Sequence, residues 1–377
     1  MSMKAISAKE INQLIVNKQP VFMLDVRNQE DFKDWKIEGE NIEYLNVPYF
    51  DLIDGVEPIL EQIPTDKPII VVCAKEGSSM MIAEMLTDKG LEVSYLQGGM
   101  KTWSEYLYPT KVYEDEDITV HQFIRVGKGC LSYIVTSGEE ALVVDPSRFV
   151  NAYTDFAIAQ GVKITHIVDS HLHADHITGG RELAEKIGAK YYLMKSEGAV
   201  FEFEHLEQYE KIEFANVKLE VLAVKTPGHT PGSVSFFVND KLLFSGDTIF
   251  VSGLGRPDLG GKAREWAVDL YDSIYQKVSQ IADDVIVLPG HYADFHGEIN
   301  EQGYIGDTLG NIRKINEMMA GKTVEEFVDH VAASAATDTP PNYEDIVAIN
   351  RGVKAATAEE QQELEIGPNR CAVHHTH

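Results

Sequence analysis

The segment 170–176 concentrates more metal-ligating side chains than a structural loop requires. It contains four of them: His171, His173, Asp175 and His176. The apolar run 164–169 predicts a buried strand, and residues 177–187 predict a helix that begins at a Gly-Gly turn. The segment is therefore expected on a loop at the carboxyl end of a strand, where α/β folds place their ligands. Imidazole and carboxylate together suit zinc or iron better than a plain solvated loop.

Composition limits the partners and the compartment. Lysine and arginine number 33 against 60 acidic residues, which gives a formal net charge of −27. Such a chain cannot neutralise nucleic-acid phosphates, and anionic membrane surfaces repel it. We see no apolar run long enough to span a bilayer and no signal-peptide core. Three cysteines make no disulfide framework, so we predict a cytoplasmic protein in which Cys130 and Cys371 are structural.

Residues 1–109 alternate strands and helices, which predicts a small parallel sheet with helices on both faces. Residues 49–63 are expected to form one of the helices. The central strand, 68–72, leads into Cys73, and a short Gly/Ser loop and a helix follow. Loop amides and a helix N-terminus favour a thiolate and can hold a persulfide or a small oxyanion, so we interpret Cys73 as reactive rather than structural. The expected sulfur-cradle loop comprises Ala74, Lys75, Glu76, Gly77, Ser78 and Ser79.

This first segment resembles a single-domain rhodanese between Ile6 and Leu107. The resemblance rests on Asp25-Val26-Arg27, on the Cys73 loop with its paired serines, and on Leu96-Gln97-Gly98-Gly99-Met100 before Trp103. It implies that Cys73 accepts a sulfane sulfur and passes it on. Many rhodanese loops carry arginine, whereas here Lys75 is the only cation and Glu76 offsets it. We therefore expect a thiol persulfide to be a better donor than doubly charged thiosulfate.

Residues 110–302 are expected to form a second domain, reached through the acidic run 114–117, which we interpret as a solvated linker. Three more stretches repeat the pattern of a strand, a glycine and a ligand-type side chain. They carry His229 after a predicted strand 221–224, Asp247 after strand 242–244, and His291 after strand 285–288. Proline and glycine on both sides hold His229 on a rigid turn. Strand ends converge on one sheet edge, so we predict one metal-binding pocket.

These stretches, from Ile118 to His291, resemble the metallo-β-lactamase superfamily, an αββα sandwich. The resemblance implies two metal positions, with Asp247 able to bridge them: His171, His173 and His229 for the first, and Asp175, His176 and His291 for the second. Two functions use these residues. Two zinc ions would hydrolyse thioesters, as in glyoxalase II. Alternatively, one iron(II) per chain would be held by His171, His229 and Asp247, with His173, Asp175, His176 and His291 as supporting groups.

Two features favour iron. The segment 253–259 resembles the Gly-Arg-x-Asp segment of the persulfide dioxygenase family, in which Arg256 either steers an anionic substrate or holds Asp258. A sulfurtransferase domain also belongs chemically beside a persulfide oxidase, because one makes or consumes what the other handles. The predicted enzyme uses dioxygen to oxidise a small thiol persulfide to sulfite and thiol in sulfide detoxification, with sulfane sulfur passing through Cys73 to the thiol or to sulfite. We expect a homo-oligomer, a dimer or larger.

Residues 303–377 are expected to form a helical extension packed on the second domain, with helices at 307–319, 324–332 and 343–353. Whether it packs against the sandwich or shapes a thiol pocket stays open at this point. The closing His374, His375 and His377 have a metal-binding composition, and we interpret them as a disordered tail.

Overall fold

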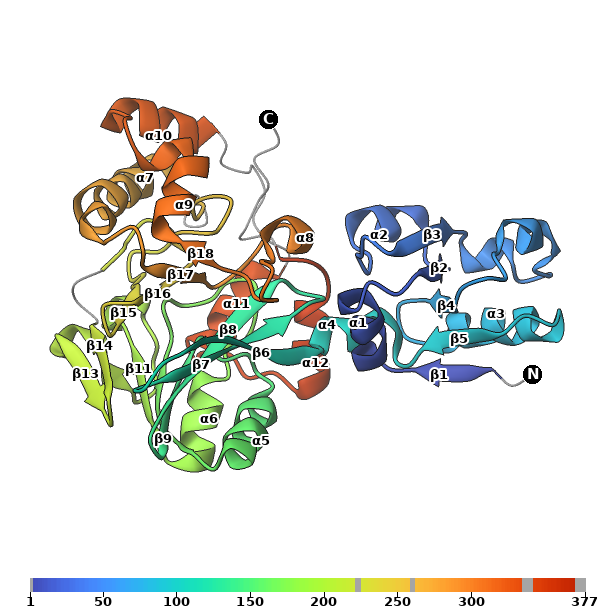
Figure 1. The fold of residues 1–377 in the computed structure, drawn as a ribbon, viewed down its shortest axis with the longest axis horizontal. Helices are drawn as coiled ribbons and strands as arrows, with labels where there is room; N and C mark the ends of the chain where they lie inside the picture. Colours follow the sequence, from blue (N-terminus) through green and yellow to red (C-terminus); the bar gives the residue numbers. More distant parts are fainter. Residues whose placement is uncertain (1–2, 221–224, 258–261, 334–341, 370–377) are drawn as a thin grey trace. The chain divides into compact units, whose positions relative to one another are not determined.

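The computed structural model describes residues 3–220, 225–257, 262–333 and 342–369. The chain forms two compact units (Figure 1). Unit 1 comprises Met1–Tyr106 with two short additions, Arg125–Lys128 and Ile366–Pro368. Unit 2 comprises Leu107–Ile124, Gly129–Glu365 and the residues from Asn369 onward.

Unit 1 is a five-stranded parallel sheet in the order β1-β5-β4-β2-β3. Alternate residues of β2, the strand between β4 and β3, enter different cores: Phe22 and Leu24 pack on one face, and Val21 and Met23 on the other. The predicted parallel sheet with helices on both faces is confirmed. The elements are β1 Lys4–Ile6, α1 Ala8–Val16, β2 Val21–Asp25, α2 Gln29–Asp34, β3 Ile42–Asn46, β4 Ile69–Val72, α3 Gly77–Asp88, β5 Val93–Leu96 and α4 Gly99–Glu105.

The single helix predicted for residues 49–63 is wrong. Two 3-10 helices, η1 Tyr49–Asp51 and η2 Glu57–Gln62, replace it. Gly55 between them has φ +150°, which no α-helix tolerates, and Pro58 opens the second piece.

Unit 2 contains two sheets, one of seven strands in the order β12-β11-β10-β9-β8-β7-β6 and one of six in the order β13-β14-β15-β16-β17-β18. The strands of the first are β6 Leu107–Glu114, β7 Thr119–Arg125, β8 Cys130–Ser137, β9 Glu140–Val144, β10 Lys163–Val168, β11 Lys190–Leu193 and β12 Glu204–His205. Those of the second are β13 Lys211–Phe214, β14 Val217–Glu220, β15 Phe236–Val238, β16 Leu242–Gly246, β17 Ile286–Pro289 and β18 Asp307–Thr308.

The two sheets pack face to face and helices cover their outer sides. Tyr133 on β8 and Phe244 on β16 meet between the sheets, with ring centroids 5.0 Å apart. α5 Val150–Gln160 and α6 Gly180–Ile187 pack on the first sheet, and α7 Ala263–Asp272 and α10 Val324–Ala333 lie against the second (Figure 1). The predicted αββα sandwich is confirmed.

The acidic run after β6 is a structured turn and not the solvated linker we expected. The Asp115 carboxylate accepts the backbone N–H groups of Asp117 and Ile118, each at 2.9 Å, and forms an ion pair with Lys241. β6 itself spans Leu107–Glu114, so residues 109 and 110 lie within a strand. Asp115 closes the β6–β7 turn, whereas Glu114, Glu116 and Asp117 are exposed to solvent as expected.

The helical extension follows the second sheet. The helix expected to begin at residue 307 begins at Leu309, because Asp307 and Thr308 form β18 and Thr308 caps the helix. The further elements are α8 Phe295–Glu298, α9 Leu309–Ile315, η7 Glu317–Met319, α11 Tyr343–Asn350 and α12 Ala358–Glu365. The predicted strand 221–224, Asp258, Cys371 and the terminal histidines lie outside the described residues. In the described part of the chain, no helix is long and apolar enough to cross a membrane.

Candidate metal centre and sulfur-transfer site

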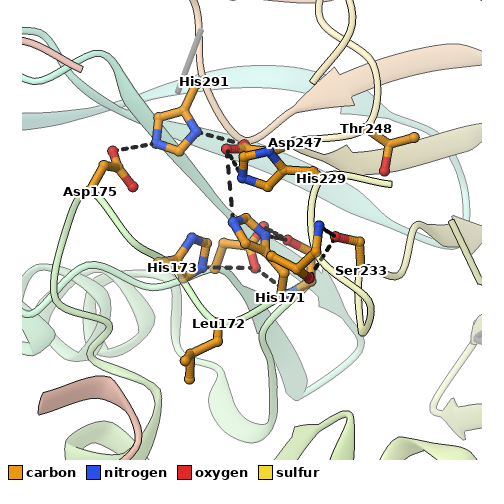
Figure 2. Close-up of polar contacts among 12 residues, drawn as sticks. His171, Leu172, His173, Asp175, His229, Ser233, Asp247, Thr248 and His291 are labelled. Carbon is orange, nitrogen blue, oxygen red and sulfur yellow. Dashed lines mark hydrogen bonds and ion pairs between the residues drawn. The ribbon is translucent and has the colours of Figure 1, made fainter. Parts of the chain in front are cut away.

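His171, His229 and Asp247 meet at the strand ends of unit 2 (Figure 2). Asp247 Oδ2 lies 3.4 Å from His229 Nε2 and 3.8 Å from His171 Nε2. The three side chains come from the loops after β10 and β16 and from the turn 226–233, and each is at most 2% exposed. The primary ligand set predicted from the sequence is therefore brought together.

Hydrogen bonds fix which nitrogen each imidazole offers. The Ser170 hydroxyl donates to Asp145 Oδ2, so it accepts from His171 Nδ1, 3.0 Å away. The Arg256 carbonyl accepts from His229 Nδ1 at 2.9 Å. Both rings therefore carry their proton on Nδ1 and turn a bare Nε2 lone pair toward Asp247.

Electrostatics keep this group in its ligating form. Burial lowers the pKa of His171 well below the usual value, and the neighbouring His173 lowers it further. Burial likewise lowers the pKa of His229. Burial alone would raise the pKa of Asp247, but the charge of His291 and its hydrogen bond outweigh burial and hold that pKa below its usual range. The result is two neutral imidazoles and one carboxylate.

These facing atoms have no hydrogen-bond partner in the part of the chain that the structure describes. His171 Nε2, His229 Nε2 and Asp247 Oδ2 are buried and accept or donate no hydrogen bond among the described residues. An unsatisfied buried polar atom costs about 1–3 kcal/mol, so three converging on one point need a common partner. A divalent metal ion fits that position, and two histidines with one carboxylate form the ligand set of non-haem iron enzymes that keep coordination positions open.

His291 links this cluster to a second one. Its Nδ1 lies 2.6 Å from Asp247 Oδ1, and its Nε2 lies 2.9 Å from Asp175 Oδ2 (Figure 2). On the far side of Asp175, His176 Nδ1 lies 3.0 Å from Asp175 Oδ1 and 3.6 Å from Cys130 Sγ. Cys130, Asp175, His176 and His291 thus form a buried group that could itself hold a metal ion.

His173 belongs to a third group in the structure. Its Nε2 lies 3.5 Å from Asp145 Oδ1 and 4.0 Å from Asp169 Oδ1, and these three could also hold an ion. The sequence-based arrangement paired His173 with His171 and His229 instead. Burial raises the pKa of Asp169 to about 6, while its Oδ2 accepts hydrogen bonds from Thr178 and Tyr191.

In unit 1 the Cys73 sulfur lies at the carboxyl end of β4 and is 5% exposed. The Glu76 amide donates to its Sγ at 3.1 Å, and Ser79 Oγ lies 3.2 Å away while donating to the Glu76 carbonyl. Glu76 adopts φ +106°, and its carboxylate accepts the Gly98 amide at 3.0 Å. Gly99 approaches the Cys73 carbonyl so closely that a Cβ would meet it at 2.5 Å. The loop is a rigid backbone cradle around one sulfur atom.

Comparison with known proteins identifies both domains. The model of the metallo-beta-lactamase superfamily matches residues 125–292, and that of the rhodanese-like domain matches residues 7–106. The human protein named persulfide dioxygenase ETHE1, mitochondrial, is 32% identical over 193 residues, which cover 50% of this chain and 70% of that protein. The chain belongs to the metallo-β-lactamase superfamily. A rhodanese-like domain precedes its metallo-β-lactamase domain.

Other relatives and structures place the metallo-β-lactamase domain among enzymes of two kinds. The bovine persulfide dioxygenase is 33% identical but matched over only 60% of its length. A hydroxyacylglutathione hydrolase from Rhizobium johnstonii is 34% identical over 136 residues, 36% of this chain and 51% of that protein. A solved structure of a metallo-beta-lactamase from Staphylococcus aureus has a TM-score of 0.56 and 28% identity, and covers 64% of this chain and 74% of that chain.

Several residues around the metallo-β-lactamase site were missed from the sequence. Asp145 was not singled out, and Cys130 was interpreted only as a structural thiol. Cys130 lies instead beside His176: burial would raise its pKa, but His176 outweighs burial and lowers it to about 7. Glu197 accepts from the Leu172 amide at 3.3 Å and from the Thr230 hydroxyl at 2.7 Å, so it joins the two histidine loops. A carboxylate that follows a strand was the signal for Asp145, whereas nothing local marked Glu197.

Arg256 reaches the metal centre of the metallo-β-lactamase domain through its backbone. Its carbonyl fixes the His229 ring, and its side chain is partly buried. Asp258, the carboxylate that the sequence paired with it, lies outside the described residues. The suggested substrate-steering role of the guanidinium stays a prediction.

Proposed function

We propose that this chain is a persulfide dioxygenase with a sulfurtransferase domain. It would use one iron(II), held by His171, His229 and Asp247, to oxidise a small thiol persulfide to sulfite and thiol. The observation that carries the proposal is the convergence of two Nε2 atoms and one Oδ2 atom, all buried and unpartnered among the described residues. The similarity to the human persulfide dioxygenase supports the choice of substrate.

In the overall reaction, persulfide, dioxygen and water give thiol and sulfite: RSSH + O₂ + H₂O → RSH + H₂SO₃. Bound iron would supply the open positions and the redox chemistry that dioxygen requires. The protein's own groups orient the three ligands. Ser170 and the Arg256 carbonyl hold the two imidazoles by their Nδ1 protons, and His291 holds the second oxygen of Asp247. These contacts leave the ligating lone pairs directed at one point.

The sulfurtransferase step would take place at Cys73. Its thiolate attacks the sulfane sulfur of a thiol persulfide, the donor's S–S bond breaks, and the thiol leaves with the electron pair. The product is a Cys73 persulfide. An acceptor thiol or sulfite then attacks its outer sulfur, the S–S bond to Sγ breaks, and the Cys73 thiolate is restored. The Glu76 amide donates to Sγ and is placed to stabilise the sulfur anion, whereas Ser79 Oγ, whose proton is used by the Glu76 carbonyl, accepts from the thiol.

A dinuclear zinc hydrolase of thioesters is the second candidate. Asp247 supports it, because one carboxylate oxygen faces His171 and His229 while the other contacts His291 in the second cluster. Such a carboxylate could bridge two ions. The similarity to hydroxyacylglutathione hydrolase points the same way.

Metal analysis separates the two functions. Protein purified without oxygen is expected to contain about one iron per chain and to consume dioxygen only when a thiol persulfide is added. Elemental analysis and an oxygen electrode measure both. Two zinc ions per chain together with thioester cleavage would instead establish the hydrolase.

The charge of the Cys73 loop predicts donor preference. Replacing Glu76→Gln keeps an oxygen for the Gly98 amide but removes one negative charge from the cradle. We expect kcat/KM for thiosulfate to rise roughly three- to tenfold, with a smaller change for a monoanionic thiol persulfide. Lys75→Gln is the matched control and should lower kcat/KM for thiosulfate. Equal effects on both donors would contradict electrostatic selection.

Location and assembly remain predictions. A cytoplasmic homo-oligomer is expected from composition, whereas the human relative is named as mitochondrial. Size-exclusion chromatography with light scattering measures the assembly directly.

A further inference from the structure

The loop that carries the metal residues contains no helix or strand between β10 and α6, and its one β-bridge pairs Thr178 with Ser147. Its backbone groups are buried, so each needs a partner from elsewhere. Two side chains of the C-terminal helices supply several of them. Asn350 ends α11 and Glu365 ends α12, and they are 4% and 0% exposed.

Asn350 is bonded to three points of this loop. Its Nδ2 donates to the His173 carbonyl at 2.8 Å and to the His176 carbonyl at 2.9 Å. Its Oδ1 accepts the Thr178 amide at 3.1 Å. Both donors and one acceptor of the amide are therefore in use, and the two carbonyls flank Asp175. A side chain without two donors cannot make this pattern.

Glu365 holds the next residue of the loop. Its Oε1 accepts the Ile177 amide at 2.6 Å, and its Oε2 accepts from Arg148 Nε at 2.7 Å. α11 also packs Tyr343 and Val347 against Ala174. Consecutive residues of the loop are thus bound by side chains more than a hundred positions later in the chain.

We propose that Asn350 and Glu365 are positioning residues for the metal centre, which hold the loop 173–178 in the shape that directs its ligands. The inference rests on the proposed metal-dependent function. In this proposal the C-terminal extension binds and shapes the metal loop directly. The carbonyls that Asn350 binds lie on either side of Asp175, and Asp175 holds His291, which holds Asp247. Displacement of the loop therefore reaches a primary ligand through two contacts.

The test is Asn350→Asp. Aspartate has the same shape but cannot donate, so the His173 and His176 carbonyls would face an oxygen. We expect Fe(II) to bind roughly 10- to 100-fold more weakly, the range typical of lost supporting contacts around a metal. Chelator competition on apo protein without oxygen measures this, and electron paramagnetic resonance of the nitric oxide adduct of the Fe(II) form should show altered iron symmetry.

Asn151→Asp is the matched control, because it makes the same change at an exposed position of α5. It should keep wild-type affinity. A folded Asn350→Asp protein with the affinity and spectrum of Asn151→Asp would overturn the inference.

Glu365→Gln keeps the inference testable if Asn350→Asp does not fold. Glutamine retains one acceptor for the Ile177 amide but loses the ion pair with Arg148. We expect roughly a three- to tenfold loss of Fe(II) affinity in this variant, and unchanged affinity would count against the proposal. Wild-type protein that binds Fe(II) but consumes no dioxygen with persulfide would refute the dioxygenase and leave the positioning role supported by these affinities.

Discussion

Replacing His229→Ala is expected to abolish both metal retention and turnover. His229 supplies one of three converging ligand atoms, and the Arg256 carbonyl holds its imidazole ring in place. Removal leaves one imidazole and one carboxylate, too few to hold a divalent ion tightly. We expect at least about a 100-fold loss in iron affinity, since loss of a mere supporting contact already costs 10- to 100-fold. Elemental analysis and persulfide-dependent oxygen uptake measure the two effects.

The matched control for this substitution is His330→Ala, at an exposed position of α10. It should keep wild-type iron content and oxygen uptake. Full metal content in the His229→Ala protein, with its fold intact by circular dichroism, would exclude His229 as a ligand. Thioester cleavage that survives the substitution would also count against the hydrolase alternative.

Replacing Cys73→Ser is expected to abolish sulfur transfer and to leave metal content unchanged. The hydroxyl is a far weaker nucleophile than a thiolate, and it cannot form a persulfide. We expect a loss of roughly a thousandfold or more in transfer from a thiol persulfide to an acceptor. Mass spectrometry of the whole variant chain should no longer show an added sulfur atom at position 73.

The same exchange at the other described cysteine, Cys130→Ser, is the comparison. Cys130 lies in the metal clusters of unit 2, so its loss should leave persulfide formation on Cys73 intact. If the Cys73→Ser protein lost its metal, the separation of the two chemistries would be refuted.

Local pattern was sufficient for the ligands that follow strands. Each of His171, Asp247 and His291 stands after an apolar run, Asp247 and His291 directly after a glycine, and strand ends share one edge of a sheet. The same sequence pattern could not predict which candidate ligands share a cluster. It depends on how the loops approach one another in space. This approach places His173 beside Asp145 and Asp169 instead of beside His229.

The long-range partners could not be predicted from the sequence, for a physical reason. Asn350 and Glu365 are the last residues of α11 and α12, and nothing in the neighbouring sequence marks one buried amide or carboxylate as different from solvated ones. In the acidic run 114–117 the predicted solvent exposure holds for Glu114, Glu116 and Asp117, whereas Asp115 closes a turn. A charged residue's role depends on the donors that the fold brings to it.

The rhodanese-like unit is not one continuous piece of chain, and this affects how its activity should be isolated. Arg125–Lys128 belongs to the same compact body as residues 1–106, where the buried Arg125 Nε donates to the Ser104 carbonyl at 2.6 Å and Val126 packs in the core. A gene fragment ending near residue 106 would therefore lack part of its own interior. Truncated sulfurtransferase preparations would confuse misfolding with lost chemistry, and single substitutions in the intact polypeptide avoid that ambiguity.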